Sequence, residues 1–224
     1  MDIRKSYDLF KPEECRERIH IIGCGAVGST IAENLVRYGL TNITLYDFDK
    51  VASHNVANQM YTEYDVGKLK VEALAAYLRK INPYLEENTF ILKPEGYTNQ
   101  RLNGYVFLCV DNIDLRRKIC YDNIGNNNIR AVFDCRMRAV DAQSYAADWL
   151  KPDSVRNLLN SMDFTHEEAL KSTPVSACNM TLSVNTTIRL ISAYCVANFV
   201  NFVKTGKLKK MILVDTFNFG LEAY

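Results

Sequence analysis

The feature that most constrains this chain is a glycine-rich turn set between two short apolar runs, in residues 18–49. The first run, residues 19–22, leads into Gly23-Cys24-Gly25-Ala26-Val27-Gly28. A helical pattern follows and closes at Tyr38-Gly39, and the second apolar run, residues 43–46, ends on Asp47-Phe48-Asp49. Strand, glycine turn, helix, strand and acid, in this order, predict a nucleotide-binding βαβ unit.

Each part of this unit has a physical role. Glycines allow a tight bend, a close approach of the backbone to phosphate, and close packing of helix on strand. The first turn of the helix presents free N–H groups and the positive end of its dipole to an anion. A carboxylate at the tip of the second strand can bind both ribose hydroxyls. The alternative is an ordinary structural turn, which would need neither the helix start nor the carboxylate. The predicted nucleotide-binding residues are therefore Gly23, Gly25, Ala26, Val27, Gly28, Asp47 and Asp49.

Composition limits the partners of such a site. The 27 Lys and Arg residues nearly cancel the 26 Asp and Glu residues, so no general field favours nucleic acid or an acidic membrane. The first residues lack the apolar stretch of a signal peptide, and a cytoplasmic location is expected. Seven cysteines without a CxxC pair indicate reduced thiols and argue against a structural zinc.

The rest of the chain alternates between strand and helix patterns. Strands are expected at residues 89–92, 105–110, 129–133, 139–149 and 211–214, and helices at 66–82, around 115–119 and at 180–203. The last helix carries Asn and Arg side chains, so it is not expected to span a membrane. These elements predict one α/β domain over residues 1–224, Rossmann-like and three-layered, with a mostly parallel mixed sheet. Residues 1–17 are expected to form an N-terminal arm, and residues 150–177 a partly helical crossover segment or lid.

Polar residues beyond the glycine turn indicate which nucleotide is bound. Asp111 directly follows the strong strand pattern, where a carboxylate suits a Mg²⁺ ion on a triphosphate better than a dinucleotide. It could instead cap the next helix. Lys68 and Lys70 near a helix start are disfavoured by its dipole unless phosphate is close, and the alternative is a solvated lysine. Asn55 and Gln59 are neutral hydrogen-bonding residues in an amide-rich loop next to the site.

Taken together, these residues resemble the ThiF/MoeB/HesA superfamily, the adenylating domain of ubiquitin-activating enzymes and their bacterial relatives. The resemblance covers about residues 10–135, and the long helix and last strand also match plausibly. It is carried by the ordered set of the glycine turn, Asp47-Phe48-Asp49, Val51, Asn55, Gln59, Gly67-Lys68-Leu69-Lys70 and Val110-Asp111-Asn112.

The resemblance implies a function. ATP and Mg²⁺ would bind at the turn, and the C-terminal carboxylate of a ubiquitin-like or small carrier protein or peptide would attack the α-phosphate. The products would be an acyl-adenylate and pyrophosphate. By analogy Asp47 binds the ribose, Asn55, Gln59 and Lys70 bind ribose and phosphates, and Asp111 holds the metal. Lys70 and Asp111 would act by neutralising charge, and a homodimer is implied.

Some positions depart from the family pattern. Asn58 stands where the family usually has an arginine, which removes one phosphate contact. Arg4, supplied across a homodimer, is one candidate substitute, and a solvated residue of the arm is the alternative. The paired CxxC knuckle of many members is missing. Cys178 precedes the long helix, where it could be a nucleophile that accepts the acyl group or a small packing residue.

Two other classes of function remain open on the sequence. An NAD- or FAD-dependent oxidoreductase would share the glycine turn and Asp47, but it leaves Asn55, Gln59, Lys70 and Asp111 unexplained. A non-catalytic nucleotide-binding scaffold of the same superfamily is consistent with Asn58.

Overall fold

A computed structural model describes residues 1–175 and 182–224, and within them one eight-stranded sheet runs through the molecule in the order β3-β2-β1-β4-β5-β6-β7-β8. The strands are β1 (Ile19–Ile22), β2 (Ile43–Tyr46), β3 (Ile91–Lys93), β4 (Gly104–Leu108), β5 (Ile129–Arg138), β6 (Asp141–Asp148), β7 (Met211–Asp215) and β8 (Gly220–Ala223). The α-helices are α1 (Arg4–Tyr7), α2 (Ala26–Arg37), α3 (Lys70–Ile81), α4 (Ile113–Asp122), α5 (Pro152–Asn160), α6 (His166–Ser172) and α7 (Asn185–Thr205).

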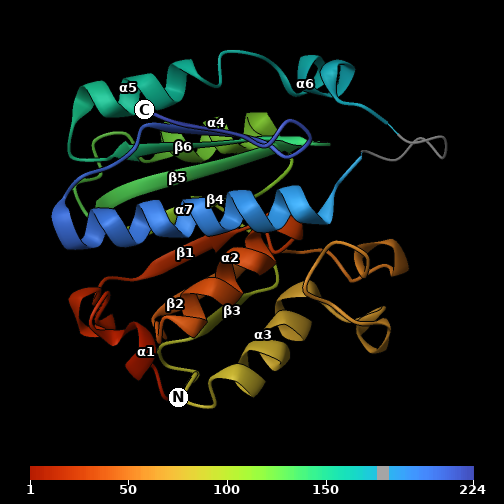
Figure 1. Ribbon diagram of the computed structural model, residues 1–224, viewed down its shortest axis with the longest axis vertical. Helices are drawn as coiled ribbons and strands as arrows, with labels where there is room; N and C mark the ends of the chain where they lie inside the picture. The colour runs from red at the N-terminus through yellow and green to blue at the C-terminus, as the bar shows by residue number, and fades with distance from the viewer. Residues whose placement is uncertain (176–181) are drawn as a thin grey trace.

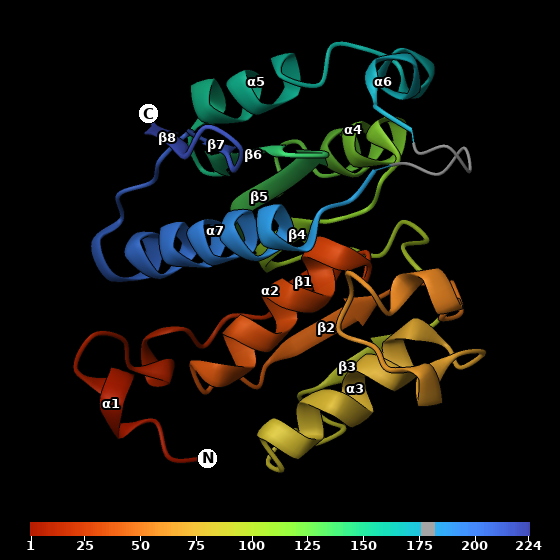
Figure 2. The same ribbon diagram turned by 45° about the vertical axis from the view of Figure 1, so that its right-hand side comes forward.

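The sheet lies between two layers of helices. The first five strands in the order of the sheet, β3, β2, β1, β4 and β5, pair in parallel. Strands β6, β7 and β8 continue the sheet with antiparallel pairing. Helices α2, α3 and α7 cover one face, and α4 and α5 cover the other (Figures 1 and 2). The predicted three-layer α/β fold with a mostly parallel mixed sheet is therefore confirmed.

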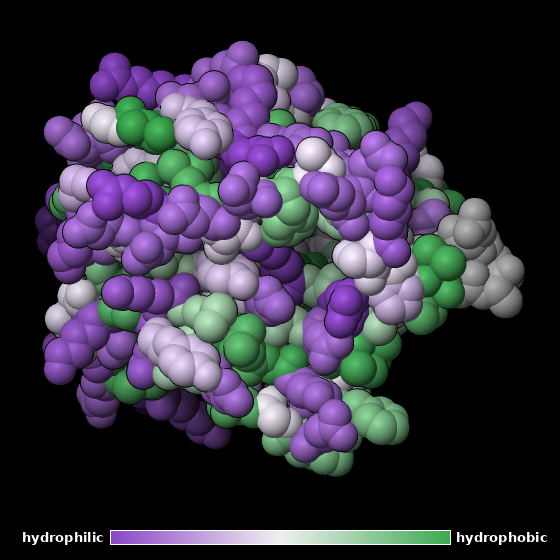
Figure 3. Space-filling model, turned by 90° about the horizontal axis from the view of Figure 1, so that it is seen from above, coloured by the Kyte–Doolittle hydropathy of each residue, from purple (hydrophilic) through white to green (hydrophobic). Residues whose placement is uncertain are grey.

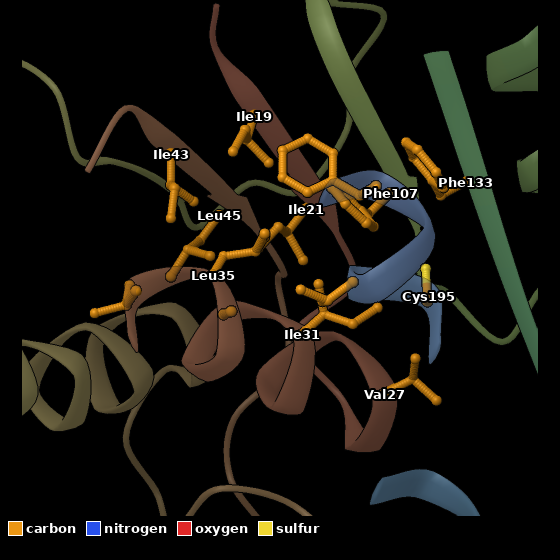
Figure 4. Packing of buried hydrophobic residues seen from close by; sticks show 14 of the residues in the cluster. Ile19, Ile21, Val27, Ile31, Leu35, Ile43, Leu45, Phe107, Phe133 and Cys195 are labelled. Carbon is orange, nitrogen blue, oxygen red and sulfur yellow. The ribbon is translucent and has the colours of Figure 1, made fainter. Parts of the chain in front are cut away.

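Strand β1 shows why its residues are apolar throughout. Its four residues are all buried, because a parallel strand in the middle of such a sheet has helices on both sides. Figure 4 shows Ile21 directed toward Ile31 and Leu35 of α2, and Ile22 packs in the second core on the other face. Fully burying one such side chain contributes about 1.5–3 kcal/mol, so this packing holds α2 against the sheet.

Aromatic rings extend this core toward α7. Phe107 of β4 stacks on Phe133 of β5 with ring centroids 4.9 Å apart, and Phe199 of α7 meets Phe107 edge-on at 5.6 Å. Helix α7 is long and apolar enough to pass for a membrane span, yet half of its most apolar window is buried within the fold. Its hydrophobicity is accounted for by the core that it completes.

Several element boundaries differ from those predicted. Helix α3 begins at Lys70 rather than at residue 66, because Gly67 has a φ of +90° and Lys50 bridges to Leu69, which keeps this segment extended. Strand β5 continues to Arg138, beyond the predicted end at residue 133, because β6 pairs with it along its whole second half. Strand β8 was not predicted, since its residues are all exposed and carry no clear alternation.

Residues 150–177 are partly helical, as predicted, and form α5 and α6 in the part that the structure describes. The N-terminal arm contains a 3₁₀ turn, Pro12–Glu14, which starts at a proline, a residue that suits the first turn of a helix. The arm is anchored to the core by Phe10, whose ring packs against Tyr38 and Phe199.

The ends of β4 and β5 are joined by buried charges. Arg116 of α4 donates to the carbonyl oxygens of Leu108, Val110 and Cys135, at 3.2, 2.6 and 2.7 Å, and forms an ion pair with Asp134. The Asp134 carboxylate is fully buried, and its other oxygen accepts from Arg136 at 2.7 Å. One side chain thus fixes the loop that follows β4 onto the neighbouring strand.

We expect Asp134→Ala to lower the free energy of unfolding by about 3–5 kcal/mol, because two guanidinium groups lose their buried counter-charge. The matched control is Asp153→Ala, which breaks the exposed pair of Asp153 with Arg156 and should change the free energy of unfolding by no more than about 1 kcal/mol. Urea unfolding of both variants measures the difference. Equal losses would contradict this role for Asp134.

Candidate functional site

The candidate site lies where the order of strands reverses. Strand β1 pairs with β2 on one side and with β4 on the other, and the chain moves outward from β1 in both directions. Open α/β sheets bind ligands at such a switch point, beyond the carboxyl ends of the strands. The glycine turn follows β1, Asp47 follows β2, and Asp111 follows β4. The three predicted parts of the site therefore meet at neighbouring strand ends.

Two glycines make the turn between β1 and α2 possible. Gly23 has a φ of +97°, and a Cβ at this position would lie 2.7 Å from the backbone of Cys109 and Val110. A Cβ on Gly28 would lie 1.9 Å from the carbonyl oxygen of Gly23. Only glycine at both positions lets α2 start immediately above the strand and lie against the end of β4.

Gly25 has a different role. It occupies the N-cap position of α2, and a Cβ built on it would have no heavy atom within 4 Å. No side chain caps this helix, so the N–H groups of Ala26 and Val27 lack the acceptor that a cap would supply. This open space in front of free N–H groups is suited to a phosphate.

The acidic tip of β2 is held rigidly beside the turn. One oxygen of Asp47 accepts from the backbone N–H of Cys24 at 2.7 Å, and the other accepts from the N–H of Asp49 at 2.9 Å. Burial raises the pKa of Asp47, and the nearby Lys70 ammonium opposes that shift. Both carboxylate oxygens keep a lone pair free, so the group can still accept from ribose hydroxyls.

Lys70 belongs to the same site. Its side chain is buried to 8% exposure at the first residue of α3, and its Nζ lies 2.7 Å from Asp49 Oδ2. The neighbouring Lys68 is exposed and pairs with Asp65 at 3.0 Å. Lys70 therefore lies in the candidate site and Lys68 on the surface. The sequence pattern alone did not distinguish between these two positions.

The loop of residues 50–69 is tied down by a tyrosine that the sequence analysis did not single out. Tyr61 is buried, and its hydroxyl donates to the carbonyl oxygen of Cys24 in the glycine turn at 2.6 Å. Asn55 is also buried, but its Oδ1 accepts from the N–H of Ala52 at 2.9 Å, so only its amide nitrogen remains for a ligand. An aromatic residue within a polar loop was the one available signal for Tyr61.

Two amides of this loop have unsatisfied oxygens. Within the described residues, Asn58 Oδ1 and Gln59 Oε1 are buried without a hydrogen-bond partner. Unpaired buried polar atoms are costly and therefore uncommon. Because O and N of an amide exchange by a simple flip, either group can also present its NH₂ to an anion. The side-chain amides of Asn58 and Gln59 can therefore still form hydrogen bonds with a ligand beside the glycine turn.

Asp111 does not cap the following helix, so that alternative is wrong. The N-cap of α4 is Asn112, whose Oδ1 accepts from the N–H of Leu115 at 2.9 Å. Asp111 is exposed, and among the residues that the structure describes none bonds to its carboxylate. One free carboxylate beside a phosphate site fits Mg²⁺, which is usually held by one or two carboxylates together with phosphate oxygens.

Asp111 also lines a groove of about 910 Å³. The groove runs from the end of β4, between α6 and the antiparallel strands, to Leu221 and Glu222 of β8. Its walls alternate apolar and charged side chains, among them Phe164, Leu213, Arg136 and Arg138. The face that carries α5 and α6 shows the same mixture of hydrophobic patches among hydrophilic residues (Figure 3).

The remaining predicted residues are not placed in the site. Cys178 lies outside the described residues, so its proposed role as a nucleophile stays a prediction. Arg4 forms an exposed ion pair with Asp2 in the N-terminal arm. Burial raises the pKa of the thiols of Cys24 and Cys195, as expected for packing residues.

Comparison with solved structures gives the fold. The crystal structure of E. coli MccB with ATP matches 95% of this chain and 64% of that chain, at a TM-score of 0.68 and 17% identity. The crystal structure of PaaA matches 95% of this chain and 65% of that chain, at a TM-score of 0.66 and 16% identity.

Curated relatives share only part of their length with this chain. Ubiquitin-like modifier-activating enzyme 5 of Rattus norvegicus is 34% identical over 116 residues, which are 45% of this chain and 29% of that protein. The enzyme of the same name from Drosophila melanogaster is 33% identical over 134 residues, 53% of this chain and 32% of that protein. The chain thus aligns with about a third of these relatives.

The family model for the ThiF family matches residues 15–219, from the strand before the glycine turn to the last hairpin. It spans every strand end that contributes to the candidate site, and the ordered motifs of the chain fall within it. The chain therefore belongs to the ThiF family.

Proposed function

We propose that this protein uses ATP to adenylate the C-terminal carboxylate of a carrier, either a ubiquitin-like protein or a peptide. The observation that carries the proposal is the convergence of the glycine turn, Asp47, Lys70 and Asp111 at one switch point of the sheet. MccB, which shares the fold, has been crystallised with ATP and with MccA, and the curated relatives are named as activators of ubiquitin-like modifiers.

The site residues divide the work of bringing two anions together. Asp47 accepts from the ribose hydroxyls, and the N–H groups of Ala26 and Val27 donate to phosphate oxygens. Lys70 donates to a phosphate oxygen, because its ammonium group has two N–H donors besides the one that bonds Asp49. Asp111 would hold Mg²⁺, which supplies further neutralisation of the phosphates.

The chemical step needs positioning and charge neutralisation rather than a base. An oxygen of the carrier's carboxylate forms a bond to the α-phosphorus, and the bond from that phosphorus to the bridging oxygen breaks. Pyrophosphate leaves with the electron pair, and the acyl-adenylate remains. Both reactants are already ionised at neutral pH, so no proton moves, and fixed positive charge carries the rate.

The groove beside Asp111 supplies the route for the carrier. It leads from β8 to the strand end where the α-phosphate would lie, so a tail bound in it would arrive carboxylate first. Its volume of about 910 Å³ admits several residues in extended form. We propose that the acyl group passes next to a thiol or sulfur acceptor.

The direct test is ATP–pyrophosphate exchange with candidate carriers that end in a free carboxylate. The proposal expects exchange that depends on the carrier and disappears when its C-terminus is amidated. ATP binding without exchange for any carrier would favour a non-catalytic scaffold of the family. Binding of NAD(H) or FAD in place of ATP would favour the oxidoreductase alternative.

Replacing Gly25 by Ala separates the nucleotide site from the fold. The methyl group meets no atom of the protein, but it projects into the space in front of α2. We expect Gly25→Ala to keep the thermal midpoint and to weaken ATP binding about tenfold or more, measured by calorimetry. Gly28→Ala is the contrasting variant, because its methyl collides with the Gly23 carbonyl and should lower the midpoint itself. An unchanged ATP affinity in folded Gly25→Ala would count against the site.

Lys70 and Lys68, which are two residues apart, provide a matched pair of variants. We expect Lys70→Met to reduce the exchange rate about 10²–10³-fold, as for loss of one preorganised group that stabilises transition-state charge. Lys68→Met should change the rate less than about twofold, since Lys68 pairs only with Asp65 at the surface. Circular dichroism confirms that both variants are folded, and equal rates would exclude the assigned role of Lys70.

Asp111→Asn should affect the metal-dependent step more than nucleotide binding. We expect ATP to bind within a few-fold of the wild-type affinity, while exchange falls at least 10²-fold and needs more Mg²⁺. Asp114→Asn, which alters a surface carboxylate one helical turn away, is the control and should stay near the wild-type rate. Loss of exchange in both variants would indicate that the substitutions disturb the start of α4, and would contradict the role of Asp111 as a metal ligand.

A further inference from the structure

Helix α7 brings an arginine to the loop that lacks the one expected from the family pattern. The resemblance to the family implies an arginine at position 58, and this chain has Asn58 there. Two residues further on, Met60 Sδ lies 2.8 Å from Nη1 of Arg189. A guanidinium thus reaches the same loop from a different element of the fold.

The contact links Arg189 through Met60 to the first turn of α2. The N–H of Met60 donates to Ser29 Oγ at 3.2 Å, and the N–H of Ser29 donates to the carbonyl oxygen of Gly25 at 2.9 Å. On the same side of α7, Ser192 Oγ donates to the carbonyl oxygen of Val27 at 3.5 Å. Figures 1 and 2 both show α7 and α2 side by side. This turn is the one that offers its N–H groups to phosphate.

The present contacts of Arg189 are weak enough to exchange. A thioether sulfur is a poor hydrogen-bond acceptor, and the nearest carboxylate oxygen, Glu33 Oε2, is 3.6 Å away. The remaining contact is a hydrogen bond from Nε to Asn185 Oδ1 at 3.2 Å on the same helix, which leaves the terminal N–H groups available. Glu33 has a closer partner in Arg37, at 2.7 Å on the same helix. The Arg189 side chain is 43% exposed, so its planar donors can turn without displacing core atoms.

The loop contains two buried amide oxygens that a donor from Arg189 could satisfy. Asn58 Oδ1 and Gln59 Oε1 are buried without a donor among the described residues. A guanidinium has five N–H donors in a fixed fork and can therefore bond a phosphate and an amide oxygen at once.

We propose that Arg189 binds the distal phosphates of ATP and so takes over the role of the arginine that is absent at position 58. This inference rests on the proposed function, because it requires ATP in the site. On nucleotide binding the guanidinium leaves Met60 Sδ, remains next to the first turn of α2, and donates to phosphate oxygens. The substitution at position 58 is then compensated from α7, which favours an active enzyme over a scaffold.

The test compares Arg189→Ala with Arg37→Ala, since both variants remove a partner of Glu33 and only one removes the proposed phosphate contact. Affinities for ATP and for AMP are measured by calorimetry. Hydrogen bonds to charged groups contribute about 1.5–3 kcal/mol, so Arg189→Ala should weaken ATP binding about 10- to 100-fold and leave AMP binding unchanged. Arg37→Ala should change neither affinity.

A second-site variant makes the test specific. Adding Asn58→Arg to Arg189→Ala restores the family arrangement and should recover ATP affinity and exchange rate to within a few-fold of wild type. If Arg189→Ala is poorly folded, Arg189→Gln takes its place in the test. Glutamine keeps most of the aliphatic stem and an amide donor but carries no positive charge.

The outcomes distinguish the two proposals. Wild-type protein that binds no ATP would overturn the proposed function. Wild-type protein that binds ATP, with Arg189→Ala equal to Arg37→Ala, would overturn only the role of Arg189. Equal weakening of ATP and AMP would also overturn it, because the effect would then not come from the distal phosphates.

Discussion

The structure depends on the contact between two backbones at the start of α2. Gly28 lies so close to the carbonyl oxygen of Gly23 that no side chain fits between them, and Gly23 in turn leaves no room for a Cβ against the backbone of Cys109 and Val110. These contacts bring α2 directly onto the strand ends. A helix N-terminus, an acidic tip and a free carboxylate are thereby brought to neighbouring strand ends.

Charge around this contact is arranged in two different ways. In the candidate site, Lys70 and Asp49 form a pair with one buried and one half-exposed member, and the ammonium group keeps further N–H donors for an anion. Behind the site, Arg116, Asp134 and Arg136 form a buried cluster with almost no solvent exposure, which is costly to open. The Lys70–Asp49 pair therefore suits the binding of an anion, and the buried cluster fixes the ends of β4 and β5.

The chain departs at Asn58 from the pattern that its resemblance to the family implies. The fold is shared with MccB over nearly the whole chain, although identity is low. The resemblance implies an arginine at position 58, and among the described residues Arg189 contacts the same loop through Met60. If Arg189 binds phosphate as we propose, the departure at position 58 is no evidence of a lost activity.

The sequence alone determined the fold class and the center of the site. Runs of buried strand residues, the spacing of the glycines and the acids after two of the strands are local features of the sequence. Local geometry matches them: a left-handed φ at Gly23, a buried strand at β1 and a helix start at Ala26 without a side-chain cap. Only the tertiary structure decided which of two adjacent lysines enters the site, that Tyr61 ties the loop to the turn, and that Arg189 reaches Met60. These contacts join residues far apart in the chain, or depend on the direction of one side chain. Neither is encoded in a periodic pattern, because both follow from how the layers pack.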